Sequence, residues 1–295
     1  MKRLHSLWTL GLSLGLSATA LATPVAATGL GLPPDASVDG YRIDDLIHET
    51  VAFIVVMFVI LVIWMLAAAI LYGRKGTAQY VHTTRKAQTV SLVIIAVLVV
   101  ADFSLYFRTM SDMSEVFWNF EKAEKSPNVT RIEINAHQWN WQARYAGPDG
   151  KFNTPDDIVT LNDIRVPVNA PVLFELTSTD VIHSLYFPNF RVKMDAMPGM
   201  MNRLWFQPTQ TGEYEIGCAQ HCGVNHYKMR ALFTVLPKAD YDRWVGEASA
   251  NAQRAYDPAD KVAHWGWDWT NPQPITNEVA ADAAPAAAEK TERSL

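Results

Sequence analysis

The run Cys218-Ala-Gln-His-Cys222-Gly-Val-Asn-His226-Tyr-Lys-Met229 holds both cysteines of the chain, together with an imidazole and a thioether. One tight loop of this length is able to fold these side chains around a metal. Sulfur and imidazole ligands with a weak methionine favour copper and are typical of copper electron-transfer sites. Two cysteines that each bridge can also hold two copper ions side by side. We therefore predict a copper site in this loop.

Two other interpretations of the cysteine pair stay open on the local sequence. A structural disulfide is expected in an exported domain, but it leaves His226 and Met229 without a role. Zinc tolerates the spacing of Cys218, Cys222 and His226, but it needs a fourth ligand and does not use Met229. The complete set of residues favours copper over both alternatives.

A further ligand candidate lies upstream, at His183. The preceding residues, Pro171-Val-Leu-Phe-Glu-Leu176, have the composition of a strand, and we expect His183 in a loop just past it. A histidine in such a place is usually an ordinary core or surface residue. It becomes a ligand candidate because the cysteine run lies downstream in the same predicted β domain.

Two apolar segments, 51–71 and 90–107, precede this domain. Each is long enough to cross the hydrocarbon core of a membrane. The connecting residues 72–86 carry Arg74, Lys75, Arg85 and Lys86 and no acidic side chain, whereas the flank before the first segment is acidic. The positive-inside rule therefore places the connecting loop in the cytoplasm and the β domain on the outer face.

The chain also begins and ends with recognisable segments. Residues 1–22 have the basic start, apolar run and small-residue end of a signal peptide. The predicted order is a signal peptide (1–22), a periplasmic N-terminal segment (23–50), a transmembrane hairpin (51–107), a β domain (108–237) and a C-terminal segment (238–295). The last contains a short amphipathic helix at 239–248 and an Ala/Pro/Glu-rich tail that we predict to be disordered.

Short strands are predicted across 128–237. Val129–Ala136 alternates polar and apolar residues, as a half-buried strand does. Turn signals such as Gly147-Pro-Asp-Gly150 separate the later runs, which predicts a sandwich or barrel. The formal charge of −5 argues against nucleic acid as a partner and is compatible with a basic protein partner.

Three motifs together resemble subunit II of the haem-copper cytochrome c oxidases over residues 40–237: the cysteine run, Asp180-Val-Ile-His-Ser184 and Ala136-His-Gln-Trp-Asn-Trp141. The resemblance implies a membrane-anchored chain with a cupredoxin-like β-sandwich and a dinuclear copper centre, CuA. It also implies five side-chain ligands and the backbone carbonyl of Gln220 as a sixth. The full set is His183, Cys218, Gln220, Cys222, His226 and Met229.

The resemblance further implies that cytochrome c delivers electrons near Trp139. These would pass to haem in subunit I, which reduces O₂ to water, within a complex of several oxidase subunits in a bacterial inner membrane. Two positions depart from the family pattern. Gln220 replaces a glutamate that helps to bind magnesium, so no magnesium site is expected, and Ala87 stands where a glutamate usually begins a proton-uptake path.

The alternative function is a periplasmic copper-delivery or thiol-redox protein, which would need neither Met229 nor the tryptophan segment. A quinol oxidase subunit would have lost the copper ligands. The chain has no Cys-x-x-Cys-His haem motif, so the electron donor is expected to be a separate protein. The loop 149–157 offers oxygen ligands without the spacing of an EF-hand and is interpreted as solvated. The tryptophans of 265–269 have no assigned role.

Overall fold

The computed structural model describes residues 31–73 and 84–256. The predicted signal peptide, residues 74–83 of the predicted cytoplasmic loop (72–86) and the tail beyond Tyr256 lie outside the described residues. The elements occur in an order that separates helices from strands. Two long helices come first, ten strands follow, and one helix closes the described chain.

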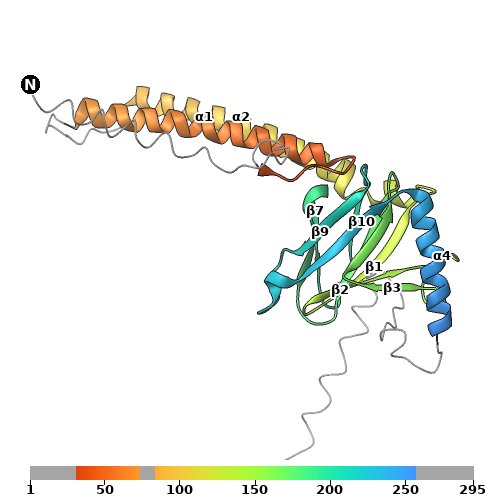
Figure 1. Ribbon diagram of the computed structural model, residues 1–295. Coiled ribbons are helices and arrows are strands. Elements are labelled where there is room, and N and C mark those ends of the chain that lie inside the picture. The colour runs from red at the N-terminus through yellow and green to blue at the C-terminus, as the bar shows by residue number, and fades with distance from the viewer. Residues whose placement is uncertain (1–30, 74–83, 257–295) are drawn as a thin grey trace, which may run out of the picture. The chain divides into compact units, whose positions relative to one another are not determined.

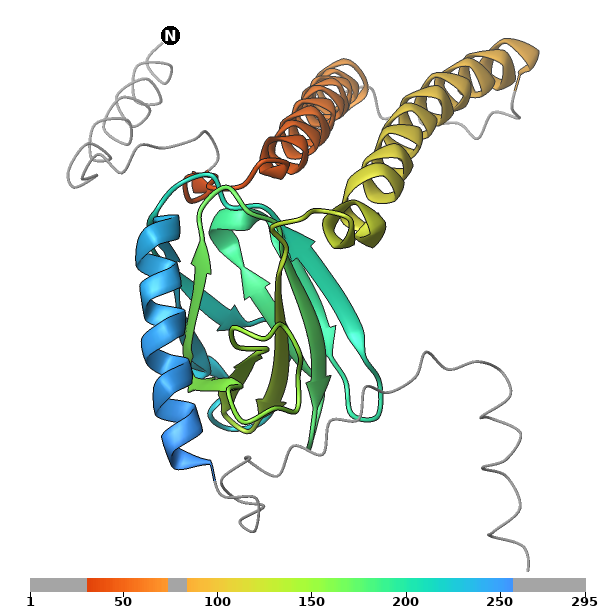
Figure 2. The ribbon, with the colours of Figure 1, turned by 90° about the vertical axis from the view of Figure 1, so that its right-hand side faces the viewer.

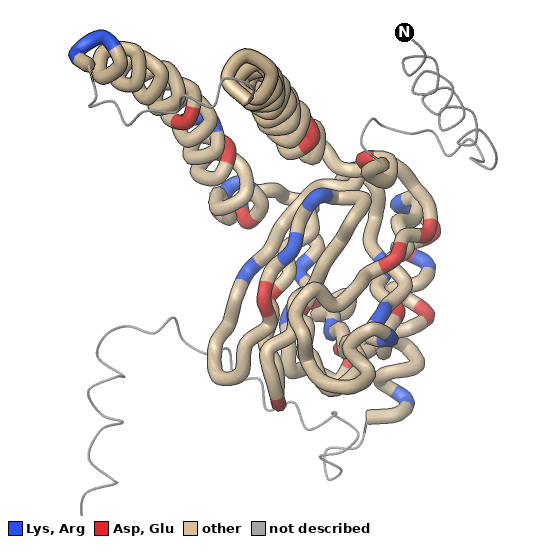
Figure 3. Tube along the Cα trace, turned by 90° about the vertical axis from the view of Figure 1, so that its left-hand side faces the viewer, with Lys and Arg blue, Asp and Glu red and all other residues tan. Residues whose placement is uncertain are grey.

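The helices α1 (Gly40–Tyr72) and α2 (Arg85–Asp112) are both long and apolar enough to cross a membrane. Figure 3 shows almost no charged residue along the middle of either helix. The apolar windows are not buried within the protein, so lipid or another chain has to cover them. Both helices extend past the predicted apolar segments, because polar residues continue the same backbone hydrogen bonding. A short π-helical turn (Met113–Phe117) and α3 (Phe120–Glu124) follow α2.

The rest of the described chain is a sandwich of two five-stranded sheets (Figure 1). The first sheet has the order β3-β2-β1-β5-β8 and the second β4-β10-β9-β6-β7. The first sheet contains β1 (Thr130–His137), β2 (Asn140–Tyr145), β3 (Ile158–Leu161), β5 (Val172–Ser178) and β8 (Asn202–Phe206). The second contains β4 (Asp163–Pro167), β6 (His183–Phe187), β7 (Val192–Ala196), β9 (Gly212–Cys218) and β10 (Arg230–Leu236).

The sheets enclose an aromatic core. The ring centroids of the buried phenylalanines lie 4.6 to 6.5 Å apart, which is the range of favourable edge and offset contacts. Strand alternation delivers these rings to one face, as the buried Phe233 and the exposed Leu232 on β10 illustrate. The cluster consists of Phe174, Phe187, Phe190, Phe206 and Phe233.

The helix α4 (Lys238–Ala255) lies along the side of the sandwich (Figure 2). Its Trp244 ring packs edge-on against the buried Tyr145 at 5.2 Å between centroids, and the Arg165 guanidinium lies over Trp244. The predicted amphipathic helix is confirmed and continues to Ala255.

The segment before α1 belongs to the sandwich. Ala36 is 2% exposed, its N–H donates to the Asn189 carbonyl at 2.8 Å, and its carbonyl accepts from the N–H of Thr209 at 2.8 Å. Asp44 of α1 accepts two hydrogen bonds from the Arg191 guanidinium, at 2.6 and 3.0 Å. The β domain therefore takes a core contact from Ala36, before α1, and an ion-pair contact from Asp44 in the first turns of α1.

The predicted strands are found with small shifts at their ends, but His183 differs from the expectation. It does not lie in the loop after β5. It is the first residue of β6 and pairs with Ala196 of β7. The physical reason is the run His183–Phe187, whose buried residues complete the second sheet while Tyr186 faces outward.

Replacing Phe233 by alanine should destabilise the sandwich by about 3–5 kcal/mol, because it leaves a cavity among four other rings. Leu232→Ala on the same strand is the matched control, since Leu232 is 41% exposed, and it should cost about 1 kcal/mol or less. Chemical denaturation of the full chain in detergent, followed by near-UV circular dichroism, measures both. Equal losses in the two variants would contradict this account of the core.

Candidate metal centre

The cysteine loop starts at Cys218, the last residue of β9, carries Cys222 and leads to β10. Its ends are held together because the Cys218 N–H donates to the Met229 carbonyl at 3.1 Å. The Ala219 N–H donates to the carbonyl of Ser184 on β6 at 2.9 Å, which ties the loop to the neighbouring strand. A short 3-10 turn at His226–Lys228 brings the loop back toward β10. These bonds leave little freedom to the side chains within the loop.

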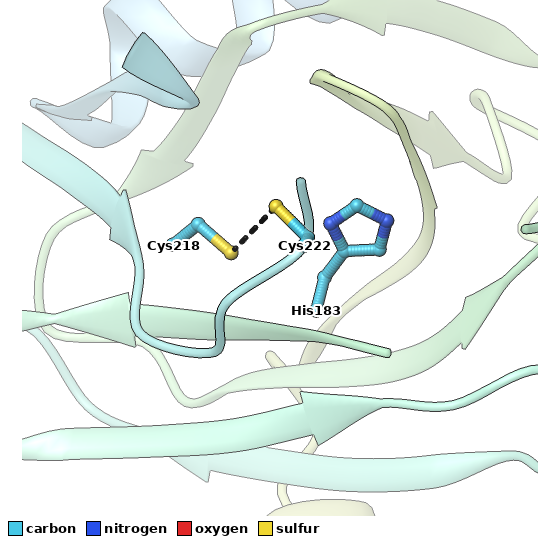
Figure 4. A group of neighbouring side chains, drawn as sticks. All are labelled: His183, Cys218 and Cys222. Carbon is cyan, nitrogen blue, oxygen red and sulfur yellow. Dashed lines mark hydrogen bonds between the residues drawn. The ribbon is translucent and has the colours of Figure 1, made fainter. Parts of the chain in front are cut away.

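The sulfur atoms of the loop converge. The two cysteine Sγ atoms are 3.8 Å apart, too far for a disulfide and close enough for a shared ion (Figure 4). Cys222 Sγ also lies 3.5 Å from His226 Nδ1 and 3.7 Å from Met229 Sδ. Cys222 and Met229 are buried, whereas Cys218 and His226 are partly exposed.

His183 completes the cluster from the adjacent strand β6. Its Nδ1 lies 3.1 Å from Met229 Sδ, and the donor atoms of His183, Cys218 and Cys222 all lie within 4.8 Å of one another. Figure 4 shows the imidazole beside Cys222. Its Nε2 lies 2.9 Å from Asp180 Oδ1. A carboxylate on the second nitrogen fixes ring orientation and tautomer, as it does for metal-binding histidines generally.

Gln220 contributes its backbone to the same place. Cys218 Sγ lies 3.2 Å from the Gln220 carbonyl oxygen, while the Gln220 side chain is exposed. The structure thus brings together all six residues that the resemblance implied as copper ligands: His183, Cys218, Gln220, Cys222, His226 and Met229.

The donor set matches copper in its chemistry. It combines two thiols, two imidazoles, a thioether and a carbonyl oxygen, and soft sulfur with imidazole suits copper. Neighbouring donors lie 3.1 to 3.8 Å apart, which is the spacing expected around ions with bonds of about 2.0–2.3 Å. A single structural zinc would use only four of these groups.

Trp139 lies on the turn between β1 and β2 and touches the cysteine loop. Its indole N–H donates to the Cys222 carbonyl at 3.1 Å, and the Gln138 side-chain amide donates to the same oxygen at 2.8 Å. Gly223 has a φ of +118°, and a Cβ there would come within 3.0 Å of Gln138 Nε2 and 3.2 Å of the Trp139 ring. A glycine is therefore required where the indole meets the loop.

Two contributors to the site were not identified from the sequence. Asp180 holds His183 and accepts a 2.6 Å hydrogen bond from the Gln138 backbone N–H. The Gln138 side-chain amide in turn donates a hydrogen bond to the Cys222 carbonyl. Asp180 lies in the motif that contains His183, and Gln138 lies in the motif that contains Trp139. The sequence signal for Asp180 is an acid three residues before a candidate metal ligand.

The two thiols differ in acidity. Burial opposes ionisation of Cys218, but hydrogen bonding, above all to His183, lowers the pKa of this thiol to about 6. Burial, reinforced by the nearby Cys218 charge, raises the pKa of Cys222 to about 12. In the metal-free protein, one thiolate and one thiol therefore face each other at neutral pH.

Among the described residues, His183, Cys218 and Cys222 form the one group of three histidine, cysteine or acidic side chains spaced to hold a metal ion. The acids of the loop 149–157 bond within that loop and, at Asp157, also to Arg144 on β2 at 3.5 Å. Asp156 accepts from the Thr154 hydroxyl at 2.7 Å, and Asp157 accepts from the Asn153 N–H at 2.8 Å.

The β domain is similar to known proteins. Residues 130–235 match the family model described as cytochrome c oxidase subunit II, periplasmic domain. The chain is 36% identical over 140 residues to the alternative cytochrome c oxidase subunit 2 of Bradyrhizobium diazoefficiens, covering 40% of this chain and 50% of the relative. It is 30% identical over 153 residues to cytochrome c oxidase subunit 2 of Alkalihalophilus pseudofirmus, covering 50% and 42%.

The chain thus spans about half the length of the curated relatives it matches. Among solved structures, the periplasmic domain of cytochrome oxidase subunit II from Bradyrhizobium japonicum is similar. The sequence identity is 28%, the match covers 41% of this chain and 94% of the other, and the TM-score is 0.37.

Alkylation of the metal-free full chain should modify Cys218 first. Its rate should rise through pH about 6 and level off above that, because the thiolate is the reactive form. Cys222 should stay unmodified at pH 7, and Cys218→Ser should remove the fast reaction. Mass spectrometry of iodoacetamide-treated protein measures this. Equal modification of both thiols, or a midpoint near the ordinary thiol value of 9.0, would contradict it.

Proposed function

We propose that this chain, whose residues 130–235 belong to the family of the cytochrome c oxidase subunit II periplasmic domain, is the electron-entry subunit of a respiratory oxidase. The observation that carries the proposal is the convergence of two thiols, two imidazoles and a thioether at one end of the sandwich. The chain would accept electrons from cytochrome c. A separate subunit I would take them up at its haem and reduce O₂ to water.

The six residues at the cysteine loop would hold a dinuclear copper centre. Bound there, copper would supply reversible one-electron exchange. The protein's contribution is a rigid set of donors. The backbone bonds of Cys218 fix the loop, Asp180 fixes the His183 ring, and Gln138 fixes the Cys222 carbonyl. A fixed donor set lets the oxidation state change with little movement of the ligands.

Trp139 is the proposed point of electron entry. Its indole hydrogen bond to the Cys222 carbonyl is a direct link between the β1–β2 turn and a residue of the donor set. The hairpin of α1 and α2 would anchor the chain in a bacterial inner membrane with the sandwich on the periplasmic side, in contact with subunit I and other oxidase subunits. Gln220 presents a neutral amide where a carboxylate would favour magnesium, so we propose that this subunit contributes no magnesium ligand.

The copper hypothesis predicts two copper ions per full chain and a delocalised mixed-valence spectrum. Cys222→Ser should abolish that spectrum, because a hydroxyl is a poor bridge between soft ions. Met194→Leu removes a thioether from β7, outside the cluster, and is the control that should leave it unchanged. One copper per wild-type chain, or zinc alone, would support the copper-delivery or thiol-redox alternative instead.

The entry hypothesis predicts that Trp139→Phe slows reduction of the copper centre by cytochrome c while copper content and spectrum stay intact. Trp205→Phe is the matched control. Trp205 is also an indole that donates to a backbone carbonyl, that of Val116 at 2.9 Å, but it lies in the other hydrophobic cluster. Stopped-flow reduction measures both variants. Unchanged kinetics in Trp139→Phe would place the entry point elsewhere.

The loops at the metal end also predict how docking responds to salt. Across residues 137–140, 179–182 and 219–229, the charged side chains are Asp180, whose carboxylate is engaged by His183, and Lys228. The same loops expose Val224 (82%) and Tyr227 (67%). The net charge of −5 favours a basic partner and by itself predicts docking that weakens as salt rises. The loops at the metal end are nearly uncharged, and salt screens charges but not apolar contacts. We therefore expect the docking rate to change little between low and physiological ionic strength. A steep fall in the same stopped-flow rates as salt rises would contradict this.

A further inference from the structure

A turn rich in methionine joins β7 to β8 in the run Met197-Pro-Gly-Met200-Met201. The Met200 N–H donates to the Met197 carbonyl at 3.3 Å, and Gly199 has a φ of +72°. Proline at the second position and a left-handed glycine at the third are the signature of a type II turn. The Cα atoms of Met197 and Met200, at its first and fourth positions, are therefore held within about 7 Å.

The turn lies beside the candidate metal centre. Ala196, the residue before it, pairs with His183, and Pro198 forms a bridge with Ser178 of β5. The Thr177 hydroxyl donates to the Met197 carbonyl at 3.4 Å. Paired residues have Cα atoms about 5 Å apart and chain neighbours 3.8 Å apart, so Met197 lies within about 10 Å of His183, measured between Cα atoms.

None of these methionines belongs to the buried core. Met200 is 47% exposed, and Met197 and Met201 are only partly buried, whereas Met229 in the metal centre is 1% exposed. A turn with proline and glycine at its centre does not require apolar neighbours. Three of the ten methionines of the chain thus stand in five residues at a solvent-accessible position.

Thioethers are neutral, soft ligands that select Cu(I). Unlike thiols, they bind it without first losing a proton. We propose that Met197, Met200 and Met201 form an acceptor site for Cu(I), from which copper passes to the neighbouring cysteine loop. The second half of this statement rests on the proposed function, because it needs a copper centre to be filled.

The transfer involves no electron. Copper arrives as Cu(I), exchanges neutral thioethers for cysteine sulfur and remains Cu(I), and a proton from any thiol that ionises is released to water. The gain is one of effective concentration. An ion captured on a turn whose backbone lies next to His183 meets the thiols far more often than one supplied from dilute solution.

The first test uses the full chain with ¹³C-methyl-labelled methionine and with Cys218→Ser and Cys222→Ser, which remove the competing thiols. Silver(I), a soft ion that does not change oxidation state here, is the probe. The methyl signals of Met197, Met200 and Met201 should shift together and saturate at one equivalent. The signal of Met194 on β7 should not move. Absence of shifts at one equivalent, or equal shifts at Met194, would overturn the site.

The second test keeps both cysteines. Replacing the three turn methionines by leucine preserves volume. Copper loading from a cuprous thiol complex should become on the order of tenfold slower, since the local capture step is lost. The final copper content should equal that of the wild type. Met194→Leu is the control. An unchanged loading rate would overturn the transfer role and leave the turn as an apolar surface.

The two proposals fail separately. If the wild-type chain never assembles a dinuclear copper centre, the proposed function is wrong. The methyl shifts of Met197, Met200 and Met201 with silver(I) still decide whether the turn binds a soft ion. If the copper centre assembles normally and the turn binds no silver, only the acceptor site is lost.

Discussion

The structure depends on the closure of one loop between two antiparallel strands. Cys218 ends β9 and Met229 precedes β10, and the hydrogen bond between their backbones pins the loop at the point where both side chains turn inward. Every other donor is arranged around that closure. His183 comes from β6, the strand that pairs with β9. Trp139 comes from the opposite sheet, and its indole N–H donates a hydrogen bond to the Cys222 carbonyl of the loop. The sandwich is the frame that brings these segments to one end.

Sulfur chemistry and hydrogen bonding act together at this closure. A buried thiol resists ionisation, yet the imidazole of His183 stabilises the thiolate of Cys218 and lowers its pKa, while Cys222 remains protonated beside it. The site is thus prepared to receive a cation, because one anionic sulfur is already present and the second is ionised only when a metal displaces its proton.

Much of this arrangement was predictable from the sequence. Apolar length and charge asymmetry predicted the helices, and alternation predicted the strands. The spacing of the cysteine run predicted that its donor groups converge, and the structure brings them together. His183 was identified as a candidate but placed in a loop, because a five-residue strand that begins with histidine is visible only through its pairing with β7. Asp180 lies three residues before His183, and that spacing was a signal that we did not use. Gln138 was missed because it bonds Cys222 across 84 residues of chain, and no sequence spacing reveals such a partner.

The contacts of Ala36 with the sandwich bear on the order in which the β domain is completed during synthesis. The first piece of the sandwich, at Ala36, is synthesised before α1, and the last strand emerges after β9, so the domain is closed by segments from both sides of the membrane hairpin. The ribosome therefore delivers the two halves of one core at different times. The early segment at Ala36 has no sandwich partners until the helices and the later strands have been made. Completion of the β domain therefore requires the synthesis of α1, α2 and the later strands.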